Sequence, residues 1–298
     1  SFAERGHQGE IQIYRKVLIN AVGIIKNKPE STYGGCFFGR EHKDTRAADS
    51  GTVRVVAEDR PVVVLSQVGG NQVFHFIAEN VARLFYIIQQ GDRDDGASRP
   101  WDPSSFFFHV VAEGSKSFPW QRRMEVLQLV ADIPESSVIT GTIWAEKAIY
   151  PPNVHCLLPS REEVRWLHGR LRTAWPAAAA AAATRSACAG RVDVGAGGGA
   201  VGEFAQEDAG ERRRSRSRIC IVLRPEEGRD WAVEVARVSR ELGMQVAWHT
   251  GVGTIVEQTS CFYSAATVAA SHGAGEVFVL VAPRRSTLLE LFPEERLG

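Results

Sequence analysis

The chain has 298 residues, 44% of them hydrophobic and 23% charged, a balance typical of a globular protein that buries a core. Its formal net charge is +0 and its pI is about 7.1, so composition gives no reason to expect a nucleic-acid or membrane-surface partner. The sequence contains no transmembrane run and no signal peptide. It starts at Ser1 rather than at Met, so we expect a fragment or a processed form.

The cysteines are scattered, and none forms a Cys-x-x-Cys pair. This spacing argues against a zinc site and leaves one or two disulfides open. Because the count is odd, at least one thiol is free or paired elsewhere. The five are Cys36, Cys156, Cys188, Cys220 and Cys261.

The first part of the chain divides into a poorly defined segment, residues 1–52, and a patterned region, residues 53–172. In the patterned region, apolar runs that predict strands alternate with helical patterns, which favours a parallel sheet with crossover helices. The predicted strands are 61–65, 106–112 and 138–144, and the predicted helices are about 72–89, 121–131 and 161–172.

The predicted helix over residues 72–89 carries two stripes at helical spacing. One stripe is apolar and includes Phe74 and Ile77. The other is polar and contains His75, Glu79, Arg83 and Tyr86. Periodicity alone describes the polar stripe as a solvent-facing surface.

Residues 173–217 are of low complexity, with an alanine run, a glycine-rich stretch and an Arg-Ser run. They offer few large apolar side chains, so we expect a disordered or loosely helical linker. The Arg-Ser run leaves RNA binding open as a minor alternative to a solvated tether.

Order resumes in residues 218–298, where strands at 219–223 and 244–248 enclose a helix that starts near Trp231 and ends at Gly243. A third strand, 267–270, and a buried strand, 287–292, follow. The series predicts a second Rossmann-like unit, and with the first it predicts an α/β fold of two such domains. The turn His272-Gly273-Ala274-Gly275 stands where open α/β sheets bind ligands, at the end of a strand.

These motifs, in their order and spacing, resemble the carboxyl-terminal domain of glycosyltransferase family 61, which includes the EGF-domain O-GlcNAc transferase and plant arabinoxylan xylosyl- and arabinosyltransferases. Glu276-Val277-Phe278 departs from the Leu-Thr-Asn usual in that family. The matching residues are Glu257, Gln258, Ser264, Ala265, His272, Gly273, Ala274, Gly275, Pro283, Thr287, Glu290, Leu291 and Pro293.

The resemblance implies a GT-B-like arrangement of the two domains with a cleft between them. It implies an inverting, metal-independent transfer of a sugar from a UDP-sugar donor to a hydroxyl of a glycan or glycoprotein acceptor, with no cofactor and no nucleic-acid partner. It also implies a Golgi or endoplasmic reticulum lumen location, and a carboxyl end that continues beyond this chain. No membrane anchor is visible in the sequence.

The same resemblance assigns site residues. Arg224 and Arg229 match arginines that would hold the diphosphate, and Glu290 would accept the ribose hydroxyls. The His-Gly-Ala-Gly turn would complete the diphosphate cradle through His272, Gly273, Ala274 and Gly275.

On the acceptor side, His75 and Glu79 match a histidine and an acid of the family, which makes Glu79 the candidate base that deprotonates the acceptor hydroxyl. The pair Asp92 and Asp94 spells the Asp-x-Asp of metal-dependent sugar transferases, but it follows a helix and stands in a polar run, so we interpret it as a loop. The alternative function is a degenerate family member that binds nucleotide or glycan without catalysis.

Overall fold

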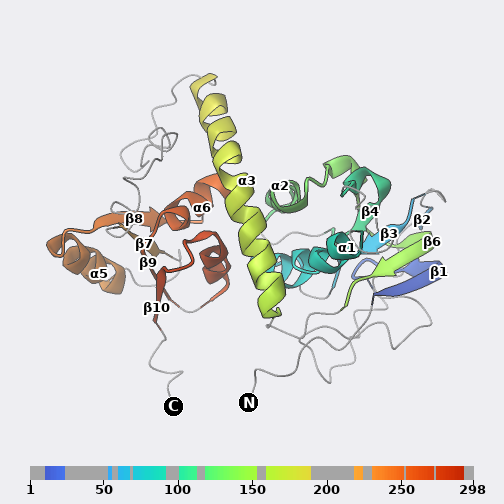
Figure 1. Cartoon of the computed structure of the whole chain (residues 1–298), viewed down its shortest axis with the longest axis horizontal. Helices are drawn as coiled ribbons and strands as arrows, with labels where there is room; N and C mark the ends of the chain where they lie inside the picture. The colour runs from blue at the N-terminus through green and yellow to red at the C-terminus, as the bar shows by residue number, and fades with distance from the viewer. Residues whose placement is uncertain are drawn as a thin grey trace, which may run out of the picture. The chain divides into compact units, whose positions relative to one another are not determined.

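The computed structural model shows a mixed α/β protein with parallel sheets (Figure 1). It divides into two compact units, residues 1–167 (unit 1) and residues 168–298 (unit 2). The structure describes residues 11–23, 53–55, 60–67, 70–91, 101–112, 118–152, 159–188, 218–223, 230–251, 253–271 and 273–291.

Unit 1 is organised by a sheet with strand order β1-β6-β3-β4-β5, to which β2 adds beside β6. Strand β3 is parallel to β4 and to β6, whereas β1 is antiparallel to β6. From β3 the chain runs outward to β4 and β5, and then returns to the other side of β3 as β6. The strands are β1 (Gln12–Ile19), β2 (Arg54–Val55), β3 (Val62–Val64), β4 (Phe107–His109), β5 (Val138–Ile139) and β6 (Ile143–Tyr150).

The core of unit 1 lies on its central strands. Val62, Val63 and Val64 of β3 have no exposed surface, as expected for a parallel strand that is covered on both faces. Helix α2 (Trp120–Ala131) confirms its prediction, because Met124, Leu127 and Val130 are all buried. The described part of the unit also contains the short 3₁₀ helices η6 (Pro103–Ser105) and η7 (Glu135–Ser137).

The predicted helix over residues 72–89 is not a regular α-helix. Residues His75–Val81 form a π-helix, η5, and α1 (Leu84–Gly91) follows it. The wide turn shows in the N–H of Ala82, which donates to the carbonyl of Ile77 five residues earlier. A π-turn changes the angle between successive side chains, so the α-helical period fails here, and Glu79 and Arg83 are buried instead of solvent-facing.

Two further predictions in this region were wrong in extent. The single strand predicted over residues 138–144 is two strands, β5 and β6, separated by Gly141 at a φ of +83°. The charged helix predicted over residues 161–172 is the first half of α3 (Arg161–Cys188).

Helix α3 continues through the first part of the expected linker. Leu167, Leu171, Trp175 and Ala179 recur every four residues and are all buried, which gives α3 an apolar stripe along this stretch. The alanine run that follows favours a helix, because alanine has the highest helix propensity of any residue type. Residues 189–217 lie outside the described residues.

Unit 2 confirms the predicted β-α-β-α-β series. Its four strands are all parallel, in the order β10-β9-β7-β8. Gly243 follows the helix that the sequence predicts to start near Trp231 and has a φ of +75°, as its sequence position indicated. The elements are β7 (Arg218–Val222), α5 (Asp230–Glu241), β8 (Gln245–His249), α6 (Ile255–Tyr263), β9 (Thr267–Ser271), the 3₁₀ helix η10 (Ala274–Val281) and β10 (Thr287–Leu291).

The prediction of a buried strand over residues 287–292 was wrong in its burial. Strand β10 forms, but it is an edge strand, and Leu288 and Leu289 are 41% and 44% exposed. The sequence predicts an apolar strand correctly. Because β10 pairs with β9 alone, it lies at the edge of the sheet.

A disulfide joins Cys220 of β7 to Cys261 of α6, with a Cα–Cα distance of 5.4 Å. The sequence left open whether any cysteines form disulfides, and the structure answers this for Cys220 and Cys261. None of the helices in the described part of the chain has both the length and the apolarity that crossing a bilayer requires.

Candidate functional site

The carboxyl ends of β3 and β6 lie side by side in unit 1. The strand order reverses between these two strands, and open α/β sheets bind ligands at such a switch point. Arg83 connects the two ends, because its guanidinium donates to the carbonyl of Leu65 at 3.5 Å and to the carbonyl of Pro151 at 3.0 Å. The candidate site of unit 1 is therefore the group of side chains at this edge of the sheet.

The two predicted catalytic residues of unit 1 meet at this edge. Nδ1 of His75 lies 2.9 Å from Oε1 of Glu79, one turn further along η5. Gln67, which follows β3, donates through Nε2 to the other carboxylate oxygen, Oε2. The Glu79 side chain is 1% exposed, and the His75 side chain is 16% exposed. Glu79 is therefore held from two sides, and His75 is the member of the pair that reaches the surface.

Glu79 sets the protonation behaviour of His75. Hydrogen bonding to Glu79 raises the pKa of His75 above its usual range, burial opposes the rise, and the charge of Glu79 adds to it. Facing a carboxylate, Nδ1 carries the ring proton, so the neutral ring presents Nε2 as the acceptor. A histidine oriented by an acid in this way can take a proton from a hydroxyl group.

Buried residues of opposite charge lie beside this pair. Arg83 is 1% exposed, and burial lowers its pKa to about 10 against the opposing effects of Tyr150, Glu163 and Glu79. Glu163 is also buried, in the first turn of α3, where its carboxylate accepts from the N–H of Ser160 at 2.7 Å. The opposite charges of Arg83 and the two glutamates offset part of the cost of burying each of them.

A second histidine lies near the same strand end. Nδ1 of His109 lies 2.5 Å from Oγ of Ser66, and its Nε2 lies 2.7 Å from the carbonyl of Gly141. Because a carbonyl only accepts, Nε2 carries the proton, and the Ser66 hydroxyl donates to Nδ1. Both side chains are buried, a side chain at Gly23 would overlap Ser66, and burial lowers the pKa of His109 to about 4. We interpret the pair as a structural link between β3 and β4.

In unit 2, the switch point lies between β7 and β9, which are neighbours and end at Val222 and Ser271. Arg224 and His272, predicted to hold the diphosphate, come just after these two strands in the sequence. Both residues, and Arg229 with them, lie outside the described residues. The structure thus brings together the strand ends that precede them.

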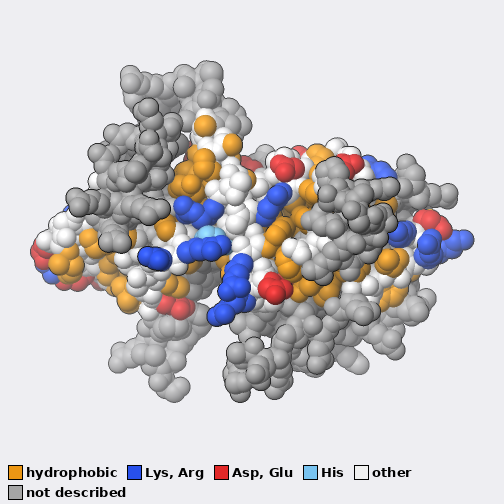
Figure 2. Space-filling model, viewed as in Figure 1, with side chains coloured by type: hydrophobic (Ala, Val, Ile, Leu, Met, Phe, Trp, Pro, Cys, Tyr) orange, Lys and Arg blue, Asp and Glu red, His pale blue; other side chains and the backbone are white. Residues whose placement is uncertain are grey.

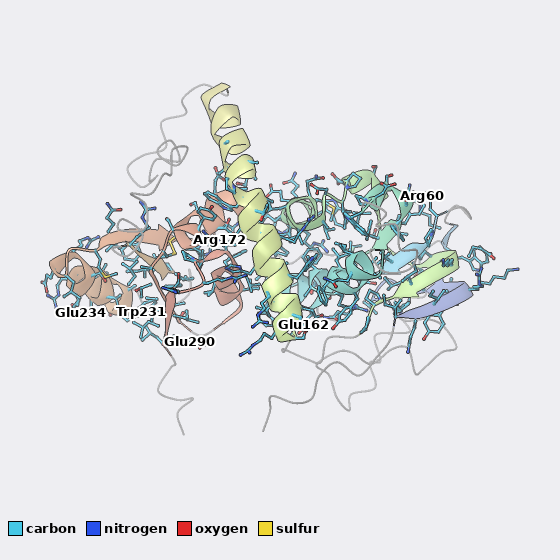
Figure 3. The ribbon with its side chains drawn as sticks, in the orientation of Figure 1. Arg60, Glu162, Arg172, Trp231, Glu234 and Glu290 are labelled. Atoms are coloured by element: carbon cyan, nitrogen blue, oxygen red, sulfur yellow. A yellow bond between two sulfur atoms is a disulfide. The ribbon has the colours of Figure 1, made fainter. Side chains whose placement is uncertain are left out.

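The rest of the predicted nucleotide site is described in part. Gly273 has a φ of +153°, and Ala274 and Gly275 begin η10. Glu290 lies on β10 (Figure 3), is partly exposed, and pairs with Ala270 one residue before the carboxyl end of β9. Gly273 and Glu290 are therefore both near the carboxyl end of β9.

Two of the residues that carried the family resemblance act in building α6. Thr254 and Glu257 form a capping box, in which Oγ1 of Thr254 accepts from the N–H of Glu257 and the Glu257 carboxylate accepts from the N–H of Thr254. Gln258 is buried and donates to the carbonyl of Gly253 at 2.9 Å.

Lys and Arg side chains gather over α3 in the centre of the space-filling view (Figure 2). Within unit 2, two basic side chains of this helix are bound to backbone carbonyls: Arg172 donates to those of Tyr263 and Val281, and His168 donates to that of Ala282. Arg172 also lies over the ring of Tyr263 at 4.3 Å. These contacts fasten α3 within unit 2, so they do not indicate an anion site.

Sequence reasoning missed Gln67, Asn80 and Glu163. Their burial depends on the π-turn and on contacts between segments far apart in the chain, and no local pattern reports either. In the described ranges, no group of His, Cys, Asp and Glu side chains could hold a metal ion, and Asp92 and Asp94 lie outside those ranges.

No model of a known protein family matches the chain, and neither does any curated protein.

Proposed function

We propose that this protein is a glycosyltransferase that moves a sugar from a UDP-sugar to a hydroxyl of a glycan or protein, with inversion and without a metal requirement. The observation that carries the proposal is the His75–Glu79 pair at the switch point of unit 1. The motif resemblance and the parallel sheet of unit 2, with adjacent β7 and β9, support it.

In this proposal, His75 is the base. Its Nε2 takes the proton of the acceptor hydroxyl while the oxygen attacks the anomeric carbon of the donor, and the bond to the UDP oxygen breaks with its electron pair. Glu79 orients the ring and stabilises the imidazolium that forms. The sequence favoured Glu79 as the base; the geometry favours His75, because both Glu79 oxygens are engaged and its side chain is buried.

Unit 2 is proposed to hold the donor. The leaving diphosphate needs positive charge and oriented N–H groups, which Arg224, Arg229 and the turn from His272 to Gly275 would supply. Glu290 would accept the ribose hydroxyls. The GT-B-like arrangement of two domains around a cleft belongs to this proposal and rests on the motif resemblance.

The Cys220–Cys261 disulfide supports the proposed location. Disulfides persist in oxidising compartments such as the endoplasmic reticulum lumen and are rare in the cytosol. The secretory pathway is also where the implied acceptors, glycans and glycoproteins, are found.

UDP release tests the proposal directly. The chain is incubated with UDP-N-acetylglucosamine, UDP-xylose or UDP-arabinose and with mixed glycan acceptors, with and without EDTA. We expect UDP release with one donor, unchanged by EDTA, and a fall of about 10²–10⁴-fold in His75→Gln, the usual contribution of a general base. Activity that EDTA removes and manganese restores would contradict the metal-independent mechanism.

One observation favours the alternative, a binding protein without catalysis. Glu276 puts a negative charge next to the turn proposed to hold diphosphate. Tight UDP binding without turnover for any donor would establish this alternative.

A further inference from the structure

Two buried amide side chains of unit 1 have unpartnered polar atoms. Among the residues that the structure describes, neither Nδ2 nor Oδ1 of Asn80 has a hydrogen-bond partner, and neither does Oε1 of Gln67. Asn80 has no exposed surface and Gln67 is 8% exposed. Burying a polar group without a partner costs the full desolvation of that group, so such atoms are rare in native folds and call for an explanation.

These amides adjoin the His75–Glu79 pair. Asn80 follows Glu79 in η5, and Gln67 donates to Glu79 through Nε2 while its own Oε1 remains unpartnered. The unpartnered atoms therefore belong to Gln67, which contacts Glu79 just after β3, and to Asn80, the residue that follows Glu79 in η5.

The Asn80 amide packs closely against the backbone at Gly70. The N–H of Gly70 donates to the carbonyl of Gln67 at 3.0 Å, which closes a turn between β3 and η5. A Cβ at this position would overlap Nδ2 of Asn80 and would lie 3.0 Å from the Gln67 carbonyl oxygen. Any larger residue at position 70 must therefore displace the Asn80 amide.

The chemistry of these atoms indicates the ligand. An amide offers both donors and acceptors without net charge, which matches a sugar hydroxyl that also donates and accepts. Two of the three unpartnered atoms are oxygens, and the Gln67 amide also donates to the Glu79 carboxylate, so an anionic group would be repelled. A buried site of this kind discriminates strongly against analogues that lack the hydroxyl.

We propose that Asn80 and Gln67 form a subsite that binds hydroxyl groups of a sugar acceptor next to His75. The proposal rests on the proposed function only in naming the sugar as the acceptor. Asn80 is thus a binding residue that the free protein keeps at a cost in stability.

Asn80→Leu tests this by separating stability from binding, because leucine has a similar size and no polar atoms. We expect the melting temperature of the chain to rise by about 2–6 °C, since the unpartnered amide is gone. The sugar probes are methyl β-D-galactopyranoside, methyl β-D-xylopyranoside and methyl α-D-mannopyranoside, followed by saturation-transfer NMR. We expect one of them to bind the unmodified chain and to bind Asn80→Leu at least about tenfold more weakly.

Gln258→Leu is the matched control for stability. Gln258 is also a buried amide, but it donates to Gly253, so its removal should lower the melting temperature. Gly70→Ala is the second variant for binding, because its Cβ displaces the Asn80 amide. The double variant Gly70→Ala/Asn80→Leu should bind no more weakly than Asn80→Leu alone, since both changes act on the same amide.

The outcomes are distinct. If no probe binds the unmodified chain, or if Asn80→Leu binds as well as the unmodified chain, the subsite does not exist. If Asn80→Leu melts lower, as Gln258→Leu should, the amide has partners and the premise is wrong. A chain that binds a sugar through Asn80 but releases no UDP from any donor keeps the subsite and removes the proposed transferase function.

Discussion

Nδ1 of His75 and Oε1 of Glu79 lie 2.9 Å apart across one turn of a π-helix, with the carboxylate buried and the ring partly exposed. This relationship separates two roles that look alike in the sequence. The buried acid cannot reach a ligand without breaking its contacts to His75 and Gln67, whereas the imidazole can use Nε2.

Glu79→Gln should shift the pH dependence of the proposed reaction. Glu79 raises the pKa of His75, and the base must be neutral, so activity of the unmodified chain should rise with pH through a midpoint above 6.5. Removing the carboxylate's charge should move that midpoint to lower pH while activity falls less than in His75→Gln. A pH profile of UDP release measures both. Equal loss in the two variants with no shift would identify Glu79 itself as the base.

The His75–Glu79 pair should also make stability depend on pH. Activity should rise with pH, whereas the stability that the pair contributes should fall with pH. A raised histidine pKa in the folded state stabilises the fold fully below pH 6.5, and this contribution is lost as pH rises through the raised pKa. The difference in melting temperature between the unmodified chain and Glu79→Gln should therefore shrink between about pH 6.5 and higher pH. A difference that does not change with pH would show that the pair is not coupled in the folded state.

His109 should make the fold sensitive to acid. Burial lowers its pKa to about 4, so between pH 6.5 and about 4 the unfolded chain binds a proton that the folded chain does not. Stability should fall by about 1.4 kcal/mol for each pH unit in that window from this group alone. Denaturant unfolding from pH 7 to pH 4 measures the slope. His109→Gln should have a shallower slope, and an identical slope would show that other groups dominate.

The disulfide of unit 2 should be a large part of its stability. Cys220 and Cys261 are 41 residues apart, and the chain-entropy relation for a loop of that length gives about 4 kcal/mol. Melting curves with and without dithiothreitol should differ for the unmodified chain. The double variant Cys220→Ala/Cys261→Ala should melt lower than the oxidised chain and should not respond to the reductant. A response equal to that of the unmodified chain would point to another disulfide.

Trp175→Ala should destabilise unit 2. The Trp175 ring is 2% exposed, stacks on Tyr263 with centroids 4.1 Å apart, and donates through Nε1 to Thr259 at 2.9 Å. Truncating a buried tryptophan costs about 3–5 kcal/mol. Trp248→Ala is the matched control, because Trp248 is 39% exposed and its loss should change stability far less. Equal effects in chemical denaturation would show that α3 does not depend on this contact.

Arg224→Ala should weaken nucleotide binding without involving the acceptor side. Loss of a charged hydrogen-bond partner to phosphate should cost about 1.5–3 kcal/mol in UDP affinity. His75→Gln, by contrast, should leave UDP affinity nearly unchanged, because His75 belongs to unit 1. Calorimetric titration with UDP compares the two. If His75→Gln weakens UDP as much as Arg224→Ala does, the division of labour between the units is wrong.

Much of the local structure could be predicted from the sequence. Apolar runs predicted β3, β7 and β9, and periodic apolar residues predicted α2. The burial of these segments follows from their own apolar residues. The alternation of strands and helices gave the parallel sheets of both units. The sequence placed His75 and Glu79 one turn apart on the same helical stripe, and the structure shows that their side chains meet.

Only the tertiary structure decided burial and pairing wherever they depend on distant segments. The π-turn rotated Glu79, Asn80 and Arg83 into the interior, where the ends of β3 and β6 supply their surroundings. Strand β10 is apolar in sequence, but it pairs on one side only and stays exposed at the sheet edge.

The length of α3 and the pairing of Cys220 with Cys261 also depend on segments that are far apart in the sequence. Trp175 is buried against α6, where it stacks on Tyr263 and donates to Thr259, and the fold brings the Cα atoms of Cys220 and Cys261 to 5.4 Å from each other. The sequence shows which apolar side chains each segment has available for burial. The free energy gained by burying them depends on which distant segment packs against them.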